Sequence, residues 1–486
     1  APKKVWHESS RKAHYKKRPE AIPFFAVFNI FQSHESRIFP ARKPKERRVP
    51  ADAITVPPYQ VGTPETIDDW RAYYERLEQM DREVGQLLSE LEASGEADNT
   101  IIVYCSDHGG VTLRSKRYLH DTGTRVPLLV VFPEKWQHLA PSAPGSVSER
   151  LVQFIDLPKT FLSLAGLEPP EVMPGRIFLG EAIEPAPESV FLFSGRFDES
   201  PDNSRGVTDG RWKYIRNFES DRPRFQMLHY PLRQDGQVSQ WKAWASGKTN
   251  ALQSAFYEPQ PAEELYDTQA DPHEVNNLVA SRPDMLHAMR ARLRAHILET
   301  HDLGLIPEPM MEAMDASGSQ TIYDYGQSRD NYPLAQILDL SVLASDGDPA
   351  NQAVLVEALE DKNPILRYWG ALGLRVLSAK MPISEKVLNK ALADSEPSVR
   401  IQAAIALGRS GHRERATSYL LQEAEGAADD MHGAWALDGI KLLDAPEALA
   451  KLSAEEIRSL KKGQYTGRIL GLLQAGGSVS RMPPKP

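Results

Sequence analysis

Three short apolar runs near the start of the chain have the composition of buried β-strands. They are Pro23–Ile30, Thr100–Cys105 and Gly123–Pro133, and each is rich in β-branched or aromatic residues. Strands buried on both faces are typical of a parallel sheet that is covered by helices on either side. The pattern therefore predicts an α/β core in the first part of the chain.

One long amphipathic helix is predicted between the first two runs, from about Ile67 to Ser94. Apolar residues recur there every three or four positions, and we expect this stripe, which includes Trp70 and Tyr74, to face the core. A strand, a helix and a second strand in this order predict a right-handed parallel crossover. Residues 35–63 are rich in Pro and Arg and predict a long loop after the first strand. Long loops at the end of a strand tend to shape the substrate pocket.

Asp107 and His108 stand at the end of the second apolar run and are followed by Gly109 and Gly110. In open α/β sheets, ligands bind at this end of the strands. A carboxylate and a neutral imidazole are both common metal ligands, so the junction predicts a metal site. From these residues alone a second interpretation stays open, in which Asp107 caps the next segment and His108 is an ordinary surface residue.

The pattern changes to short strands after about residue 170. Two strand-like runs, at residues 189–193 and 204–215, are rich in apolar residues, and Asp209–Gly210 supplies a tight turn inside the second. These features predict a small antiparallel subdomain followed by a helix. Residues 303–335 contain Pro, Gly, Ser and Asp without clear periodicity and predict a linker.

An internal repeat with a 33-residue offset follows the predicted linker. Its first unit contains Ala358, Leu359, Asp361, Pro364, Arg367, Ala371 and Leu374. Its second unit contains Ala391, Leu392, Asp394, Pro397, Arg400, Ala404 and Leu407. Helix pairs with this repeat bury their apolar faces only by stacking, which predicts an independently folding solenoid over residues 336–475. We expect Ala371 and Ala404 to be buried, and Arg367 and Arg400 to bond an Asp of the adjacent repeat.

The composition is that of a globular protein. The 486 residues are 41% hydrophobic and 25% charged, and the net charge of −9 argues against bulk binding to nucleic acid. No apolar run approaches the roughly 18 residues that span a membrane. The single cysteine, Cys105, excludes an intrachain disulfide and is expected to be an inert, buried thiol within a strand.

Five motifs in the same order resemble those of the sulfatase family, within the alkaline phosphatase superfamily. They are Ser33–His34, Ser106–Gly109 with Ser115–Arg117, Gly123–Val130, Ile155–Leu162, and Glu264–Asp267 with Asp271–Leu278. Glu299–Asp302 is similar to the heparan N-sulfatase (sulfamidase) branch. The repeat resembles HEAT-type repeats.

The resemblance implies a fold class and a domain order. We expect a partial α/β sulfatase-like core over residues 1–170 and the family's small antiparallel β/α subdomain over residues 171–305. A linker at residues 306–335 and an all-α HEAT-repeat solenoid at residues 336–475 complete the chain. The implied function is hydrolysis of sulfuric esters or sulfamates on sulfated glycans.

The resemblance also assigns roles to individual residues. Asp107 and His108 would bind a divalent cation, most plausibly calcium, as part of a larger ligand set. Lys116 and His34 would be catalytic, with Lys116 on the sulfate oxygens and His34 on the leaving-group oxygen or the sulfate. Arg117 and His120 would be additional substrate-binding residues.

The family's nucleophile motif, C-x-P-S-R or S-x-P-S-R, is not in the printed sequence. Its first residue becomes formylglycine in sulfatases, so we expect the chain to be a fragment, inactive as it stands, with the formylglycine in a missing N-terminal region. Two other functions stay open: a non-catalytic sulfatase remnant that presents the HEAT repeats to a protein partner, and a phosphoester hydrolase of the same superfamily. The resemblance further implies a sulfated carbohydrate substrate, no nucleic acid, no membrane span, and a periplasmic or secreted location.

Overall fold

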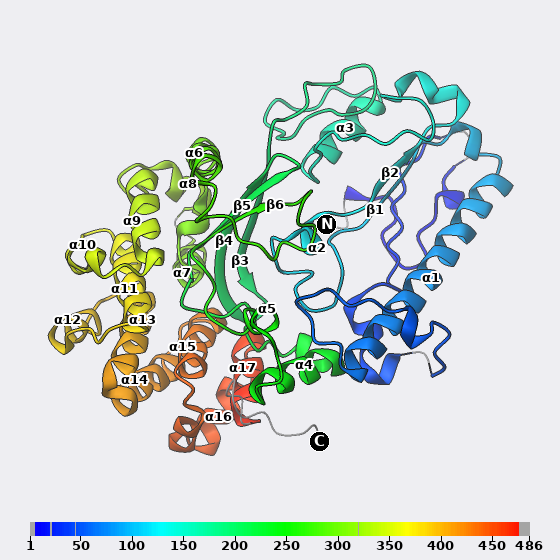
Figure 1. Ribbon diagram of the computed structural model, residues 1–486. Coiled ribbons are helices and arrows are strands. Elements are labelled where there is room, and N and C mark those ends of the chain that lie inside the picture. Colours follow the sequence, from blue (N-terminus) through cyan, green and yellow to red (C-terminus); the bar gives the residue numbers. More distant parts are fainter. Residues whose placement is uncertain (1–4, 20–21, 44, 319, 476–486) are drawn as a thin grey trace.

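The computed structural model describes residues 5–19, 22–43, 45–318 and 320–475 (Figure 1). A region with one long helix and a two-stranded sheet lies on one side of the molecule. A four-stranded sheet stands in the middle, and a curved array of helices lies on the other side. The three regions follow one another along the chain, and the last helix of the array returns to the middle of the molecule.

The first region contains α1 (Pro64–Ala93), β1 (Ile102–Cys105), α2 (Asp121–Thr124), β2 (Leu128–Val131) and α3 (Asp156–Leu164). β1 and β2 pair antiparallel. The predicted parallel crossover between residues 23–30 and β1 does not form, because residues 23–30 are not a strand.

The predicted strand at residues 23–30 does not form. A strand requires ladder hydrogen bonds from a neighbour, and none of the described residues makes them with this segment. Its side chains lie at the surface, with Phe25 61% and Val27 55% exposed. Composition indicated a strand here, but pairing decides whether one exists.

Helix α1 is close to its prediction and begins at Pro64, with the Thr63 side chain as its cap. Its apolar stripe is only partly buried, since Leu91 is buried whereas Tyr74 is 40% exposed. The buried face also carries Asp69 and Glu75. Both carboxylates accept backbone N–H groups of other segments, Asp69 from Gly236 at 2.7 Å and Glu75 from residue 48 at 2.6 Å. Polar anchoring therefore replaces part of the expected apolar packing.

The middle sheet is antiparallel, as predicted for this region. Its strands lie in the order β3-β4-β5-β6. Its strands are β3 (Val190–Phe197), β4 (Ser200–Thr208), β5 (Trp212–Asn217) and β6 (Glu263–Asp267). The expected Asp209–Gly210 turn joins β4 to β5, with Gly210 at a φ of 92°. The accompanying helices are α4 (Asp235–Ala245), α5 (Ala251–Ser254) and α6 (Pro283–Glu299).

The third region is helical throughout. Its helices are α7 (Glu308–Ser317), α8 (Ile322–Gln327), α9 (Leu334–Asp346), α10 (Gln352–Ala358), α11 (Pro364–Ser378), α12 (Glu385–Ala391), α13 (Pro397–Leu407), α14 (Arg413–Glu425), α15 (Asp430–Leu442), α16 (Ala454–Leu460) and α17 (Gln464–Gln474). Among the residues with described positions, no helix has the length and apolar character to cross a membrane.

The predicted linker is not an extended connection. Residues 306–335 contain α7 and α8 and bury Ile306, Met310 and Tyr332. These helices have 10 and 6 residues, which is too short for a repeating apolar pattern to stand out in the sequence.

The repeat prediction is confirmed at its small residues. Ala371 and Ala404 are 1% and 0% exposed, and they lie on α11 and α13, which pack against each other. Arg367 bonds Asp394 of the next repeat at 2.7 Å, as expected. Arg400 instead pairs with Glu423, at 2.5 Å, so the arginine keeps its position while its partner changes from Asp to Glu.

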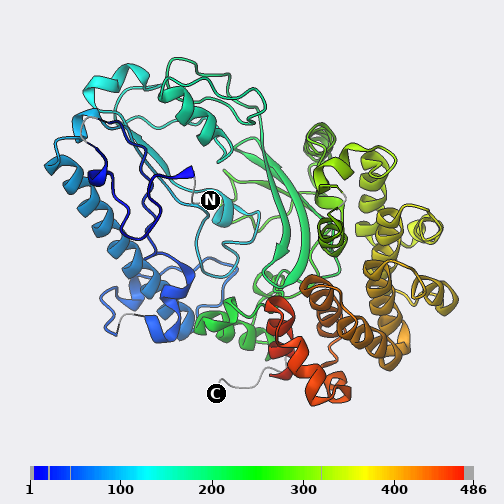
Figure 2. The same ribbon diagram turned by 180° about the vertical axis from the view of Figure 1, so that it is seen from behind.

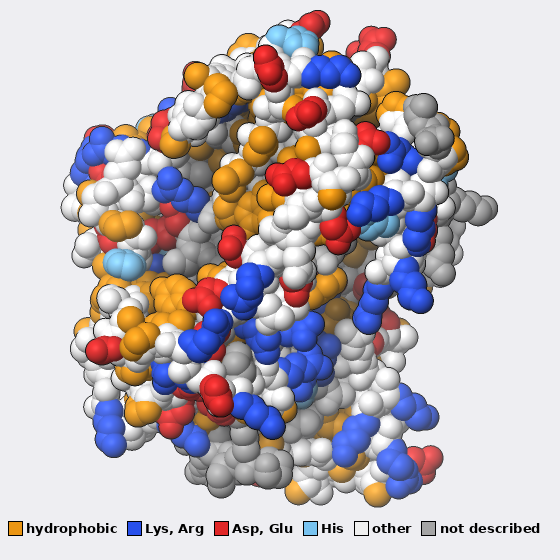
Figure 3. Space-filling model, turned by 90° about the vertical axis from the view of Figure 1, so that its right-hand side faces the viewer, with side chains coloured by type: hydrophobic (Ala, Val, Ile, Leu, Met, Phe, Trp, Pro, Cys, Tyr) orange, Lys and Arg blue, Asp and Glu red, His pale blue; other side chains and the backbone are white. Residues whose placement is uncertain are grey.

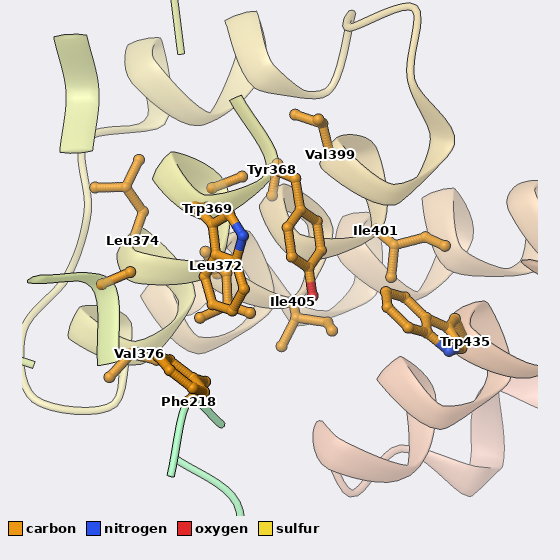
Figure 4. Packing of buried hydrophobic residues seen from close by; sticks show 14 of the residues in the cluster. Phe218, Tyr368, Trp369, Leu372, Leu374, Val376, Val399, Ile401, Ile405 and Trp435 are labelled. Carbon is orange, nitrogen blue, oxygen red and sulfur yellow. The ribbon is translucent and has the colours of Figure 1, made fainter. Parts of the chain in front are cut away.

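The helical array is not independent of the middle sheet, contrary to the prediction. One continuous apolar core runs from sheet residues such as Val207 and Leu265 to the helices of the array. At the junction the Phe218 ring meets the Trp369 ring edge-on, with centroids 5.7 Å apart (Figure 4). The view from behind shows the array curving along the sheet (Figure 2). Sheet and helices therefore share a core.

A buried ionic cluster reinforces this junction. It consists of Glu219, Asp221, Arg222, Arg375, Arg409, Asp438 and Lys441. Arg375 from α11 bonds both Glu219 and Asp221 at 2.6 Å. Burial alone would raise the pKa of Asp221, but Arg375 and Arg409 hold it below its usual range. Charges from the loop after β5 are thus neutralised by charges from the helices.

Arg375→Ala should destabilise the protein by about 3–5 kcal/mol, because it leaves two buried carboxylates without this partner. Arg367→Ala, which removes a partly exposed pair, should cost only about 1 kcal/mol. Urea unfolding followed by circular dichroism measures both. Asp221 has a lowered pKa, so its contribution is present above the unfolded value and is lost as the pH falls. Equal losses for the two variants would contradict this role of the cluster.

Ala404→Leu should destabilise the protein by about 1–3 kcal/mol, because a larger side chain has no space between α11 and α13. Ala353→Leu, at an exposed position of α10, is the matched control and should change stability by less than about 0.5 kcal/mol. Thermal unfolding compares the two. A neutral Ala404→Leu variant would show that the repeats pack loosely.

Candidate functional site

The loop after β1 is folded tightly against α2. Gly109 and Gly110 donate their N–H groups to the carbonyl oxygens of Gly123 and Thr122, at 2.9 and 3.0 Å. A Cβ on Gly109 would lie 2.0 Å from the Thr122 oxygen, and one on Gly123 would lie 2.4 Å from the Ser115 oxygen. Only glycine fits at both positions, so the two glycines set the course of the loop.

The same loop presents two cations. The Lys116 N–H donates to the carbonyl oxygen of Gly110 at 2.9 Å, which closes the loop on itself. Arg117 has a φ of 86°, a left-handed conformation that costs a non-glycine residue about 1–3 kcal/mol unless its surroundings hold it. The ion pairs of its side chain provide that hold.

Glu35 is the anchor of the site. Its carboxylate is fully buried and lies 3.1 Å from the Arg117 guanidinium and 3.3 Å from the Lys116 ammonium. The Gln234 side chain donates a further hydrogen bond at 3.1 Å. On its other side Arg117 pairs with Asp198, between β3 and β4, at 2.7 Å. Segments that are distant in the sequence therefore meet at one carboxylate.

His34 lies beside these cations. Its Nδ1 accepts the Ser36 N–H at 3.2 Å and lies 2.9 Å from the Ser36 hydroxyl. Burial and then the nearby Lys116 lower the pKa of His34, so the neutral ring prevails at pH 7. With Nδ1 as the acceptor, the proton of the neutral ring is on Nε2. His34 can thus donate a hydrogen bond to an oxygen placed near Lys116.

Asp107 and His108 lie at the surface near His34, since both affect the pKa of His34. Their side chains are 87% and 32% exposed. Calcium prefers six to eight oxygen ligands. The described residues contain no group of three or more His, Cys, Asp or Glu side chains that could hold a metal ion. Asp107 and His108 therefore do not make a complete calcium site on their own.

His120 and Arg117 are largely buried and already have charged partners. His120 is 3% exposed and lies 3.4 Å from Glu264, and burial followed by Arg114 lowers its pKa to about 3. Arg117 is engaged by Glu35 and Asp198. Both side chains support the framework around the loop, and their substrate-binding role stays a prediction.

Cys105 also differs from expectation. It ends β1 opposite Leu128 and is exposed, because the two-stranded sheet leaves its outer positions uncovered. Partial burial and the adjacent Asp107 raise the pKa of its thiol, so it stays protonated at neutral pH.

The structure brings together His34, Lys116, Asp107 and His108, which stand 82 or fewer residues apart in the sequence. Sequence reasoning missed Glu35, Asp198 and Gln234. A signal existed for Glu35 alone, a carboxylate directly after the candidate histidine. Asp198 and Gln234 carry no motif and reach the site only through the fold.

Three family models match the chain. The sulfatase model matches residues 10–167, and the model of the C-terminal part of N-sulphoglucosamine sulphohydrolase matches residues 109–239. The HEAT-repeat model matches residues 352–441. The first two overlap over residues 109–167, which include Lys116.

Individual proteins show the same relation. An ulvan-active sulfatase of Formosa agariphila is 31% identical over 359 residues, which are 66% of this chain and 59% of that protein. Human N-sulphoglucosamine sulphohydrolase is 29% identical over 271 residues, 51% of each. The chain spans about half the length of the curated relatives it matches. A solved putative sulfatase from Bacteroides fragilis is 21% identical, with 54% of this chain and 51% of that one covered and a TM-score of 0.38.

The first four motifs lie within the residues that the two sulfatase family models match. Residues 10–239 belong to the alkaline phosphatase-like sulfatase family, and residues 352–441 carry HEAT repeats.

Proposed function

We propose that the site around Glu35 binds the sulfate group in a sulfatase reaction, the hydrolysis of sulfate esters or sulfamates on glycans. One observation carries the proposal: a lysine that a buried carboxylate orients lies beside a neutral histidine with a free N–H. An anion with several oxygens can use both donors at once.

Each residue has a distinct part in this proposal. The Lys116 ammonium neutralises the negative charge of the sulfate oxygens, so that a nucleophile can approach the sulfur while the S–O or S–N bond breaks. The Nε2–H of His34 donates to the leaving-group oxygen or nitrogen. Glu35 keeps the Lys116 ammonium close to His34 without a need to touch the substrate.

The substrate class rests on the relatives. They include an ulvan-active sulfatase, N-sulphoglucosamine sulphohydrolase and an N-acetylglucosamine-6-O-sulfatase from Bacteroides thetaiotaomicron. We therefore propose a sulfated glycan as the substrate, in a periplasmic or secreted location. Sulfatases use calcium and formylglycine, and Asp107 and His108 remain the proposed contribution of this chain to the calcium site.

A non-catalytic role is the second candidate. The printed sequence contains no C-x-P-S-R or S-x-P-S-R motif to supply the nucleophile. In that case residues 10–239 would bind a sulfated glycan without cleaving it, and the HEAT repeats would present a surface to a protein partner.

We expect residues 1–486 to bind N-sulfoglucosamine but not to turn over sulfated aryl esters, because no activated nucleophile is present. Lys116→Ala should weaken binding by about 1.5–3 kcal/mol, as for the loss of one charged hydrogen bond. Isothermal titration calorimetry measures the affinity. Lys248→Ala, at an exposed position of the α4–α5 connection, is the control and should bind as the wild type does.

Three outcomes would contradict the proposal. Turnover that is lost on mutation of a residue in this chain would show that a nucleophile is present. Equal affinity of the Lys116→Ala and wild-type proteins would remove Lys116 from the site. Preference for a phosphorylated over a sulfated sugar would favour the alternative function, a phosphoester hydrolase of the same superfamily.

Glu35→Gln should lower the pKa of His34 further, because the Glu35 charge is one of the influences that raise it. Asp198→Asn also removes a partner of Arg117 but should leave the His34 pKa unchanged. An NMR titration of the His34 ring separates the two variants. The same pKa shift in both would mean that Glu35 acts on folding alone and not on the electrostatics of the site.

A further inference from the structure

Three arginines cluster beside His34, where the loop after it packs on α1. They are Arg37, in the short 3-10 turn Glu35–Ile38, Arg42, which ends the next turn, and Arg76, on α1. The Arg76 guanidinium donates to the backbone carbonyl oxygens of Arg37, at 3.4 Å, and Arg42. These bonds hold the three residues together.

None of the three arginines forms an ion pair with a carboxylate among the residues that the structure describes. Their neighbours differ in this respect, since Lys43 and Arg47 both pair with Asp68. Burial, and then the nearby charge of Arg37, lower the pKa of Arg76. The charge of Glu75 opposes this effect only in part, so positive charge is crowded here and an anion would relieve it.

The cluster is continuous with the candidate site. Arg42 donates to the Ser36 hydroxyl at 3.0 Å, and that oxygen lies 2.9 Å from His34 Nδ1. Lys and Arg side chains gather on the face of the molecule that carries α1 (Figure 3). An anion on the arginines would therefore lie next to a sulfate bound by His34 and Lys116.

We propose that Arg37, Arg42 and Arg76 form a second anion-binding subsite, which takes another acidic group of the same glycan. Guanidinium groups bind planar carboxylates and tetrahedral oxyanions through paired hydrogen bonds, so both a sulfate and a uronic acid carboxylate fit this chemistry. The subsite rests on the proposed function, because its neighbour is the site of the reacting sulfate. It would make the protein prefer a polyanionic glycan chain to an isolated sulfated sugar.

The test compares two ligands on residues 1–486, the monosulfated N-sulfoglucosamine and a heparin tetrasaccharide. The double variant Arg37→Gln, Arg42→Gln should weaken tetrasaccharide binding by about 10- to 100-fold, as for one to two charged hydrogen bonds, and leave the monosaccharide affinity within about twofold. It should also reduce the salt dependence of tetrasaccharide binding, because fewer counterions are released. Arg37→Lys, Arg42→Lys keeps the charge and should retain most of the affinity.

The control is Arg458→Gln with Lys461→Gln, two exposed cations at α16 that change the net charge equally. It should bind the tetrasaccharide as the wild type does. Urea unfolding of each variant shows that a loss of affinity is not a loss of folding. A tetrasaccharide with its sulfates removed and its carboxylates kept tells whether the second group is a sulfate or a uronate.

The outcomes separate the two proposals. If the glutamine variant binds the tetrasaccharide as the wild type does, or the wild type does not bind it, the subsite is wrong. The glycan assignment is also wrong if a short oligonucleotide binds equally well through the same arginines. If the tetrasaccharide binds through the arginines but Lys116→Ala changes nothing, the subsite stands and the proposed sulfate site fails.

Discussion

A fully buried carboxylate must be neutralised where it lies, and the candidate site depends on how Glu35 meets this requirement. Its partners come from the loop after β1, as Lys116 and Arg117, and from the cap of α4, as Gln234. Glu35 adjoins His34, so satisfying one charge also places the imidazole beside the ammonium. Buried carboxylates also hold segments on α1, where Asp69 accepts the backbone N–H of Gly236 in α4 and Glu75 accepts that of residue 48. In this region buried charge does more than apolar packing to place the segments.

The HEAT repeats act on the site through the middle sheet. Asp438 of α15 bonds the Ser200 hydroxyl at 3.0 Å, at the start of β4. Two residues earlier, Asp198 holds Arg117, whose neighbour is Lys116. The helical array thus braces the turn that supports the loop with Lys116. This arrangement accounts for the shared core and the buried ionic cluster, and it gives the repeats a role within the chain besides any contact with a partner.

Local patterns predicted the elements whose stability is local. The length of α1, the Asp209–Gly210 turn and the buried Ala371 and Ala404 follow from helical periodicity, turn chemistry and a 33-residue repeat. Predictions that required a partner fared worse. Residues 23–30 form no strand, and β1 pairs antiparallel, because a single apolar run does not specify which segment will supply its hydrogen bonds.

The sequence by itself determined the family, the repeat and the candidates Asp107, His108, Lys116 and His34, because motifs record residue types at fixed spacing. Only the tertiary structure decided that Glu35 anchors the site and that His120 is buried behind it. It also decided that the arginines beside His34 lack carboxylate partners among the described residues. Burial and charge pairing depend on distances between segments far apart in the chain. Those distances exist only once the chain is folded.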